Sequence, residues 1–336
     1  MTIDDSARER LEGFVRDKVA ADHLSISRLE RMTGGAVQQN WAVDANVEGG
    51  TFAGPQRWVM RIDAPAKVAE SLSRAEEFRV LEAMRRAEVL APRALWLCDD
   101  AAVMGRSFFI MERLPGVAAG HKVARDAALV PDRKRLAREL AVNLARIHTL
   151  TPASAGLEFL KTRLARDNVA HYRAYLDTLR ESHSVLEWGL RWCEISAPER
   201  EEVTFIHRDY RTGNYLVAEG KMSGVLDWEF VGYGNPLEDV GWLFAKCWRF
   251  GQHHYPVGGV AQADDFLREY EAASGRRVDS AALVYWQVMA HVRWAVIALQ
   301  QRERHRSGIE PSLELALTGH ILSDLELEIL ELTERQ

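Results

Sequence analysis

The hydropathy pattern of this chain changes its period at Pro115-Gly116, and this change restricts the folds that the chain can adopt. Before that point, short segments alternate apolar and polar residues, as strands with one buried face do. After it, apolar residues recur every three to four positions over long segments, as they do in amphipathic helices. Strands grouped in one part and helices in another are typical of an α+β protein.

Residues 1–112 are predicted to form a small β-rich lobe. Alternation predicts its strands, and apolar residues at helical spacing predict its helices. Glycine and proline residues within 48–56 predict a hairpin loop. The expected strands are 40–47, 57–62, 94–98 and 107–114, and the expected helices are 5–21 and 73–87.

Residues 113–336 are predicted to form a larger, mainly helical lobe after a linker near 112–116. A chain of 336 residues is long enough for two such compact lobes. The expected helices are 132–150, one or two helices within 168–194, and most of 237–334. Three strand-like segments lie at 203–207, 214–218 and 223–228.

The composition favours a cytoplasmic protein that binds neither nucleic acid nor membrane. A net charge of -6 offers no support for a basic binding face. Cys98, Cys193 and Cys247 form no Cys-x-x-Cys pair, so we expect buried, reduced thiols and no zinc site. The polar N-terminus is not typical of a leader, and no apolar run approaches the roughly 20 residues of a membrane span.

The segment FIHRDYRTGN concentrates polar side chains between two strand-like segments. A solvated turn would explain His207, Arg208, Asp209, Arg211 and Asn214. A loop for phosphoryl transfer would explain them as well, because an Asp can accept a hydroxyl proton and an Arg can offset phosphate charge.

The residues that follow suggest that this loop is half of a site. If a tight turn is centred on Gly220-Lys221, the two flanking strands place Asn214 opposite Asp227. Asn and Asp oxygens are hard ligands that suit Mg²⁺, which takes substrate phosphates as further ligands. The pattern therefore predicts a magnesium site beside Asp209, which would orient and deprotonate a substrate hydroxyl.

These motifs resemble those of the aminoglycoside phosphotransferase and choline kinase-like family, whose members share a protein-kinase-like fold. Residues 207–209 with Asn214 resemble the catalytic H-R-D-x-x-x-x-N, and the L-D-W-E at 226–229 resembles the metal motif. The Ala-Pro-Glu at 197–199 lies before the loop, whereas a protein kinase needs this motif after the metal-binding Asp.

Further segments extend the resemblance over most of the chain. The block with Gly234, Pro236 and Asp239 is similar to the G-x-P-x-x-D of the family, and TGGAVQQNWAV at 33–43 resembles its phosphate-covering loop. YWQVMAHVRWAVIALQQ near the C-terminus resembles a bacterial subgroup, whose domain also occurs fused to acyl-CoA dehydrogenases in some animal proteins.

The resemblance implies a bilobal protein-kinase-like fold of the α+β class, with a small antiparallel sheet in the N-lobe and a larger, mainly helical C-lobe. It also implies an ATP- and Mg²⁺-dependent phosphotransferase that transfers the γ-phosphate to a hydroxyl of a small molecule. The implied residues are Asp209 and Arg211 for catalysis, Asn214 and Asp227 for the metal, and Gly34, Gly35, Arg61, Glu77, Glu112 and Leu114 for the nucleotide.

Among the nucleotide residues, Arg61 is expected to reach the phosphates and to pair with Glu77, and the backbone of 112–114 to hold adenine. The alternatives are a solvated strand residue for Arg61, a solvated helix face for Glu77 and a tight turn for Gly34 and Gly35.

Other residues also have two interpretations. Arg211 is either a phosphate contact or a surface residue, and Glu229 either touches metal or caps the next segment. We expect His207 and Asp239 to support the loop backbone, and His148 to be a core histidine. The tryptophans of the C-terminal part either line a substrate pocket or pack the core.

Two other functions remain open at this stage. One is a catalytically silent nucleotide-binding module and the other is a protein kinase, although no key side chain is missing and no peptide-docking segment follows Asp227. The sequence leaves the acceptor open among an antibiotic, a choline-like amine, a sugar and a hydroxyacyl compound, because acceptor contacts vary within a shared fold.

Overall fold

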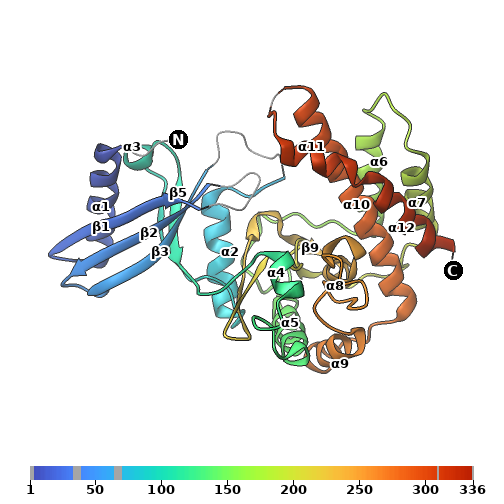
Figure 1. Ribbon diagram of the computed structural model, residues 1–336, viewed down its shortest axis with the longest axis horizontal. Helices are drawn as coiled ribbons and strands as arrows, with labels where there is room; N and C mark the ends of the chain where they lie inside the picture. Colours follow the sequence, from blue (N-terminus) through green and yellow to red (C-terminus); the bar gives the residue numbers. More distant parts are fainter. Residues whose placement is uncertain (1–3, 33–38, 64–69, 309, 335–336) are drawn as a thin grey trace. The chain divides into compact units, whose positions relative to one another are not determined.

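The computed structural model describes residues 4–32, 39–63, 70–308 and 310–334, and its packing divides the chain into two units (Figure 1). The N-terminal unit comprises Met1–Pro115 together with Ser223–Phe230, and the second unit comprises Gly116–Met222 and Val231–Gln336. The chain is thus α+β, as predicted.

The predicted boundary assigned residues 226–229 to the C-terminal lobe, but the structure packs Ser223–Phe230 with the N-terminal unit. Backbone hydrogen bonds explain this difference. The Val225 N–H donates to the carbonyl oxygen of Leu90 at 2.8 Å, and the Leu72 N–H donates to the carbonyl oxygen of Glu229 at 2.9 Å.

A five-stranded antiparallel sheet forms the centre of the N-terminal unit, with the strand order β1-β2-β3-β5-β4. The expected strands and helices are all present. The elements of this unit, apart from β8 and η1, are α1 (Asp5–Val19), β1 (His23–Arg31), β2 (Gln39–Glu48), β3 (Gly54–Ile62), α2 (Arg74–Arg86), β4 (Ala94–Cys98), α3 (Ala101–Met104) and β5 (Phe108–Glu112).

Strand β1 was not predicted from the sequence. Its buried residues Leu24 and Ile26 alternate as expected for a strand, but the register shifts between Ile26 and Arg28, so that the next buried residue is Leu29. A bulge of this kind breaks the two-residue period on which strand prediction depends.

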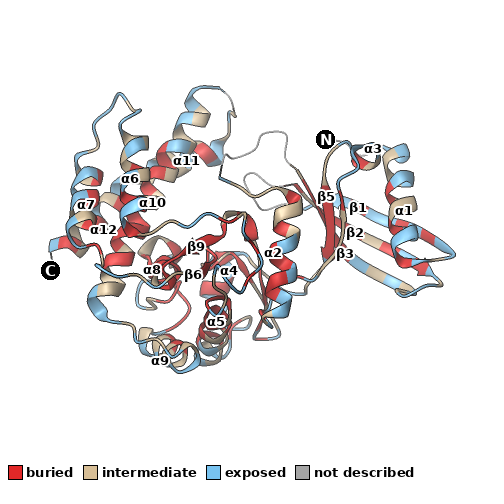
Figure 2. Ribbon diagram, turned by 180° about the vertical axis from the view of Figure 1, so that it is seen from behind, coloured by how far each residue is buried: buried red, intermediate tan, exposed pale blue. Residues whose placement is uncertain are grey.

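Helices α1 and α2 cover opposite faces of the sheet (Figure 1). The buried Leu11 and Val15 of α1 pack in one cluster with Met60 and Ile62 of β3. Because side chains alternate along a strand, Arg61 points to the other face, where α2 lies. β5 is buried along most of its length between the two helical layers (Figure 2).

Helix α10 forms the centre of the second unit and packs against α6, α7, α8, α11 and α12. The predicted long segment at 168–194 forms two helices, α6 and α7. The remaining elements are α4 (Gly120–Arg125), α5 (Arg133–Ile147), α6 (Ala165–Leu176), α7 (Ser184–Ile195), β6 (Thr204–Ile206), β7 (Tyr215–Ala218), β8 (Lys221–Val225), η1 (Trp228–Phe230), β9 (Gly232–Gly234), α8 (Pro236–Phe244), η2 (Lys246–Trp248), α9 (Ala263–Ser274), α10 (Ser280–Arg306), α11 (Leu313–His320) and α12 (Leu322–Glu334).

Helix α10 is also long and apolar enough to cross a membrane by length and composition, which the sequence analysis did not anticipate. This is weak evidence for a span, because 61% of its most apolar window is buried inside the protein. Its buried residues include Trp286, Met289 and Val292, which pack against α6 and α7. A core helix satisfies the same criteria.

The turn between β7 and β8 differs from the predicted one by one residue. Its two central residues are Glu219 and Gly220, with φ of 51° and 73°, as in a type I′ turn. The predicted turn centre at Gly220-Lys221 is therefore wrong. The cross-strand pairing of Asn214 with Asp227 was derived from that centre and does not follow from the observed turn. The three cysteines are free thiols; Cys98 and Cys193 are buried as expected, and Cys247 is half-buried.

One buried histidine of α10 predicts a pH dependence of stability. His291 is 1% exposed, and burial, with the positive charges of Arg249 and Lys246, lowers its pKa from 6.5 to about 4. As the pH falls from 6.5 to 4, the unfolded chain takes up a proton that the folded chain does not, so stability falls with the pH.

Between pH 7.5 and pH 5, the free energy of unfolding of wild type is therefore expected to fall by about 2 kcal/mol more than that of His291→Gln. Urea unfolding at the two pH values measures this difference. The exposed His253 provides the control, since His253→Gln should leave the pH dependence unchanged. Equal pH dependence in wild type and His291→Gln would contradict the prediction.

Candidate active site

Three donors surround the carboxylate of Asp209, which is 9% exposed. Its Oδ1 accepts a hydrogen bond from the indole Nε1 of Trp242 at 2.8 Å and another from Nε of Arg211 at 3.0 Å. Its Oδ2 accepts from Nδ2 of Asn214, which also donates to the Asp209 carbonyl oxygen at 3.0 Å. The second unit thus brings Asp209, Arg211 and Asn214 together, and Trp242 joins them.

A second buried carboxylate holds the backbone of the loop. Asp239, which is fully buried, accepts hydrogen bonds from the backbone N–H groups of His207 and Arg208, both at 2.7 Å. His148 Nε2 lies 3.2 Å from Asp239, and its Nδ1 lies 2.7 Å from the Tyr270 hydroxyl. The expectation that Asp239 supports the loop is confirmed, as is the core position of His148.

The protonation states follow from these contacts. Burial alone would raise the pKa of Asp239, but the hydrogen bonds that it accepts from His148 and from the backbone of His207 lower this pKa below the ordinary value. Burial also lowers the pKa of His148, so we assign a neutral imidazole whose Nε2–H donates to Asp239. Asp239 is therefore an ionised anchor for the loop.

The loop includes a strained residue at Arg208, whose φ of 64° lies in the left-handed region. Such a conformation costs a non-glycine residue about 1–3 kcal/mol. Its N–H is held by Asp239, and its carbonyl oxygen accepts a hydrogen bond from Arg293 of α10. A Cβ at Gly232 would lie 2.9 Å from Cζ of Arg208 and 3.0 Å from the carbonyl oxygen of Lys161, so a larger residue there would require the Arg208 side chain to shift.

Two tryptophans lie beside Arg211. The Arg211 guanidinium lies 4.2 Å from the ring centre of Trp248, and the Trp248 ring lies 4.7 Å from that of Trp294. Trp294 also lines an open apolar pocket of about 450 Å³ together with Leu313, Glu314, Leu317, Thr318 and Ile321. The tryptophans therefore contribute both to the core and to a pocket wall.

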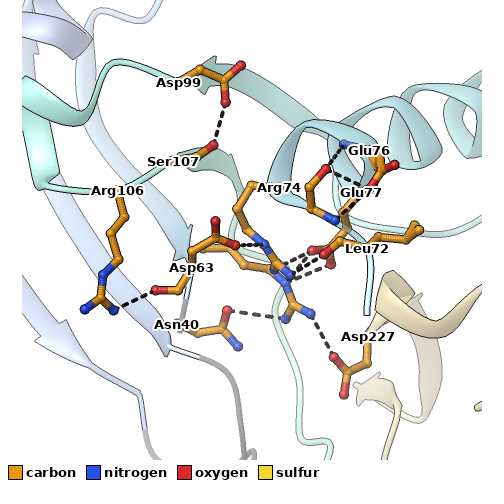
Figure 3. Close-up of polar contacts among 12 residues, drawn as sticks. Asn40, Asp63, Leu72, Arg74, Glu76, Glu77, Asp99, Arg106, Ser107 and Asp227 are labelled. Atoms are coloured by element: carbon orange, nitrogen blue, oxygen red, sulfur yellow. Dashed lines mark hydrogen bonds and ion pairs between the residues drawn. The ribbon is translucent and has the colours of Figure 1, made fainter. Parts of the chain in front are cut away.

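The N-terminal unit holds a separate charged cluster, in which Figure 3 labels Asn40, Glu77 and Asp227. Arg61 Nε lies 2.8 Å from Glu77 Oε1, Nη2 lies 3.0 Å from Asp227 Oδ1, and Nη1 donates to Asn40 at 3.4 Å. Burial would lower the pKa of Arg61, but Glu77 and Asp227 outweigh burial and raise this pKa. The expected Arg61–Glu77 pair is present, and Asp227 joins it.

The same cluster contains Arg74, which the sequence analysis did not single out. Arg74 lies 2.5 Å from Glu77 and 3.2 Å from Asp63, and both Arg74 and Glu77 are 2% exposed (Figure 3). Burial and the charge of Asp227 raise the pKa of Glu229 to about 8. Positive charge from two arginines thus balances a group of carboxylates.

The predicted hinge follows strand β5. The Glu112 N–H donates to the Arg93 carbonyl oxygen at 2.9 Å, and the Arg113 N–H donates to that of Arg57 at 3.3 Å. Among the residues that the structure describes, the Leu114 N–H has no acceptor and remains available to a ligand. Gly34 and Gly35 of the predicted phosphate loop lie outside the described residues.

Asn214 of the second unit and Asp227 of the N-terminal unit each carry an oxygen of the kind that a hard cation binds. Asn214 donates to Asp209 through its amide nitrogen, and within the described residues its amide oxygen accepts no hydrogen bond. Asp227 uses one oxygen for Arg61, and its side chain is 32% exposed. No cluster of three His, Cys, Asp or Glu side chains suited to a metal occurs in the described part. Mg²⁺ needs few protein ligands when water and phosphates supply the others.

Two residues of this site, Trp242 and Arg293, were not predicted, although the sequence contains weak indications of both. Trp242 lies three positions after Asp239 and therefore on the same side of α8. Arg293 is an arginine within the apolar run AHVRWAV of a core helix, and a charge in such a place usually has a buried partner.

Comparison with known structures shows the fold. A Ralstonia eutropha protein that is provisionally named an aminoglycoside phosphotransferase superposes with a TM-score of 0.77 and 22% identity, over 97% of this chain and 98% of that protein. Aminoglycoside phosphotransferase APH(4)-Ia, solved with AMP-PNP and hygromycin B, gives a TM-score of 0.61 and 16% identity, over 96% and 97% of the two chains. The predicted kinase-like fold is confirmed.

Sequence relatives and a family model complete the comparison. Acyl-CoA dehydrogenase family member 11 of Homo sapiens is 24% identical over 337 residues, which cover 93% of this chain and 42% of that protein. The chain spans less than half the length of the curated relatives that it matches. The model of the phosphotransferase enzyme family matches residues 28–282. The match covers most of the chain, and the protein therefore belongs to the phosphotransferase enzyme family.

Proposed function

We propose that this phosphotransferase transfers the γ-phosphate of ATP to a hydroxyl group of a small molecule, with Asp209 as the base. The observation that carries the proposal is the geometry around Asp209. Its carboxylate is held by three donors on a loop whose backbone is itself anchored by Asp239. Phosphoryl transfer depends mainly on such positioning and on charge.

In the proposed reaction, Asp209 orients the acceptor hydroxyl and takes its proton as the oxygen bonds to the γ-phosphorus. The bond between that phosphorus and the leaving oxygen of ADP breaks. Arg211, which is held between Asp209 and Trp248, offsets negative charge on the phosphoryl group. Nothing is oxidised or reduced, and the proton remains on the carboxyl group of Asp209 until it exchanges with solvent.

Arg61 is proposed to contact the nucleotide phosphates, and the 112–114 backbone to hold the base. Asn214 and Asp227 would hold Mg²⁺, which when bound neutralises phosphate charge. The AMP-PNP complex of APH(4)-Ia supports an adenine nucleotide as the donor. A dehydrogenase activity is not part of the proposal, because the matching family model is that of phosphotransferases.

Two observations indicate which classes of acceptor to test first. Structures of similar fold hold hygromycin B or kanamycin, which makes aminoglycosides one class to test. The apolar pocket beside Trp294 makes alcohols with an apolar part a second class. A screen should therefore include both classes together with amino alcohols and sugars.

The test is ADP release from Mg-ATP, measured across this screen with Asp209→Asn as the control. The proposal expects at least one alcohol to stimulate ADP release in wild type and not in the variant. AMP-PNP binding without stimulation by any alcohol would instead favour a silent nucleotide-binding module. Phosphate incorporation into a generic protein substrate would favour a protein kinase.

A further inference from the structure

The oxygen atoms of Asp209 have unequal surroundings. An ionised carboxylate oxygen offers about two lone-pair positions to donors. Both positions on Oδ1 are used, one by Trp242 Nε1–H at 2.8 Å and one by Arg211 Nε–H at 3.0 Å. Oδ2 accepts from Nδ2 of Asn214 and, among the described residues, from no other donor. One lone-pair position on Oδ2 thus remains for a proton.

Trp242 reaches this carboxylate from a rigid element. It belongs to helix α8 and is 2% exposed, and Asp239 of the same helix anchors the loop backbone. One helix therefore fixes both the backbone of the loop and the carboxylate at its centre. The indole N–H can only donate, so its contact with Asp209 requires an acceptor oxygen at that position.

Arg293 of α10 supports Trp242 from its ring face. Its guanidinium lies 4.4 Å from the Trp242 ring centre, and it donates to the carbonyl oxygen of Arg208. Arg293 thus restrains the indole ring and the loop together. Because Arg293 stacks on a buried ring, the Trp242 indole cannot rotate freely, and its N–H stays directed at Asp209.

We propose that Trp242 is a positioning residue for Asp209. Its N–H and that of Arg211 occupy Oδ1, so that Oδ2 is the atom that takes the hydroxyl proton. This inference rests on the proposed function of Asp209 as the base. It predicts that loss of the indole N–H lowers turnover without weakening nucleotide binding, because Trp242 contacts the base and not the proposed nucleotide residues.

The sharpest test replaces Trp242 by β-(3-benzothienyl)alanine, which keeps the shape of the ring and removes the N–H donor, with Trp242→Phe as a second variant. ADP release from Mg-ATP with water as acceptor is expected to show kcat lowered about tenfold, as for loss of one hydrogen bond to a charged group. KM for ATP is expected to stay constant. Unchanged kcat in both variants, with an active wild type, would overturn the inference.

Trp188→Phe is the matched control. The Trp188 indole N–H also donates to a side chain, the Thr333 hydroxyl at 3.0 Å, but this bond joins α7 to α12 and involves no residue of the candidate site. It should leave kcat unchanged. If Trp188→Phe lowers kcat as much as Trp242→Phe does, the effect is a general one of losing an indole and the inference fails.

A measurement that needs no turnover tests the same contact. The indole ¹⁵N–H signal of Trp242, assigned by its loss in Trp242→Phe, is expected to shift more than any other indole signal in Asp209→Asn. An unmoved Trp242 signal would overturn the inference even if the protein transfers phosphate. Absence of ADP release in wild type with water and with every alcohol of the screen, together with a shifted Trp242 signal, would reject the proposed function and leave the contact established.

Discussion

Asp209→Asn is expected to lower kcat for phosphoryl transfer by about 10²- to 10⁴-fold, the usual contribution of a general base. The amide has the size of the carboxylate and can accept from Trp242 and Arg211, but it cannot take up the hydroxyl proton. AMP-PNP affinity is expected to remain unchanged, since the residues proposed to bind the nucleotide are others. ADP release gives kcat, and titration calorimetry gives the affinity.

The control for this variant is Asp264→Asn. Asp264 is exposed in the first turn of α9, belongs to the same unit and makes no contact with the loop. Asp264→Asn should unfold at a temperature close to that of wild type, and a circular dichroism spectrum like that of wild type shows that Asp209→Asn is folded under the assay conditions. Wild-type kcat in Asp209→Asn would show that this carboxylate is not the base.

Arg61→Met is the second change with a large expected effect, this time on stability. Arg61 is buried between Glu77 and Asp227, and Glu77 is 2% exposed. Removing one partner of a buried ion pair leaves a charge without its counter-charge, which typically costs about 3–5 kcal/mol. Arg74 still contacts Glu77, so we expect the lower end of that range. Urea unfolding measures the loss.

A double-mutant cycle separates the ion pair from general packing. Glu77→Gln keeps an acceptor for Arg74 and removes the negative charge, so Arg61→Met combined with Glu77→Gln should cost less than the sum of the two single changes. Arg57→Met on the same face of β3 is the control, because Arg57 is exposed and should change stability by less than about 0.5 kcal/mol. Additive effects of the two buried changes would contradict a coupled pair.

Local patterns in the sequence were sufficient for most of the fold. The alternation in 40–47 and 57–62 predicted β2 and β3, and the helical spacing in 132–150 predicted α5. The pairing of Arg61 with Glu77 was implied by the family resemblance of the segments that carry them, and the structure contains this pair. The HRD motif predicted which loop would carry the candidate site.

What could not be predicted depends on geometry that a local pattern does not contain. The bulge after Ile26 interrupted the alternation that would have predicted β1, and the turn after β7 is centred on Glu219-Gly220, one residue before the expected centre. The contact of Trp242 with Asp209 joins residues 33 positions apart through the packing of a helix on a loop. From the sequence, Trp242 was expected only to line a substrate pocket or to pack in the core.

We propose that this chain transfers a phosphoryl group from ATP to an alcohol, with Asp209 as the base. ³¹P NMR of a reaction with Mg-ATP and the alcohol that stimulates ADP release most strongly can detect the product itself. We expect a new phosphomonoester signal that grows in equal amount with ADP in wild type and is absent with Asp209→Asn. ADP and inorganic phosphate with no phosphomonoester, or the same phosphomonoester at the same rate from Asp209→Asn, would disprove the proposal.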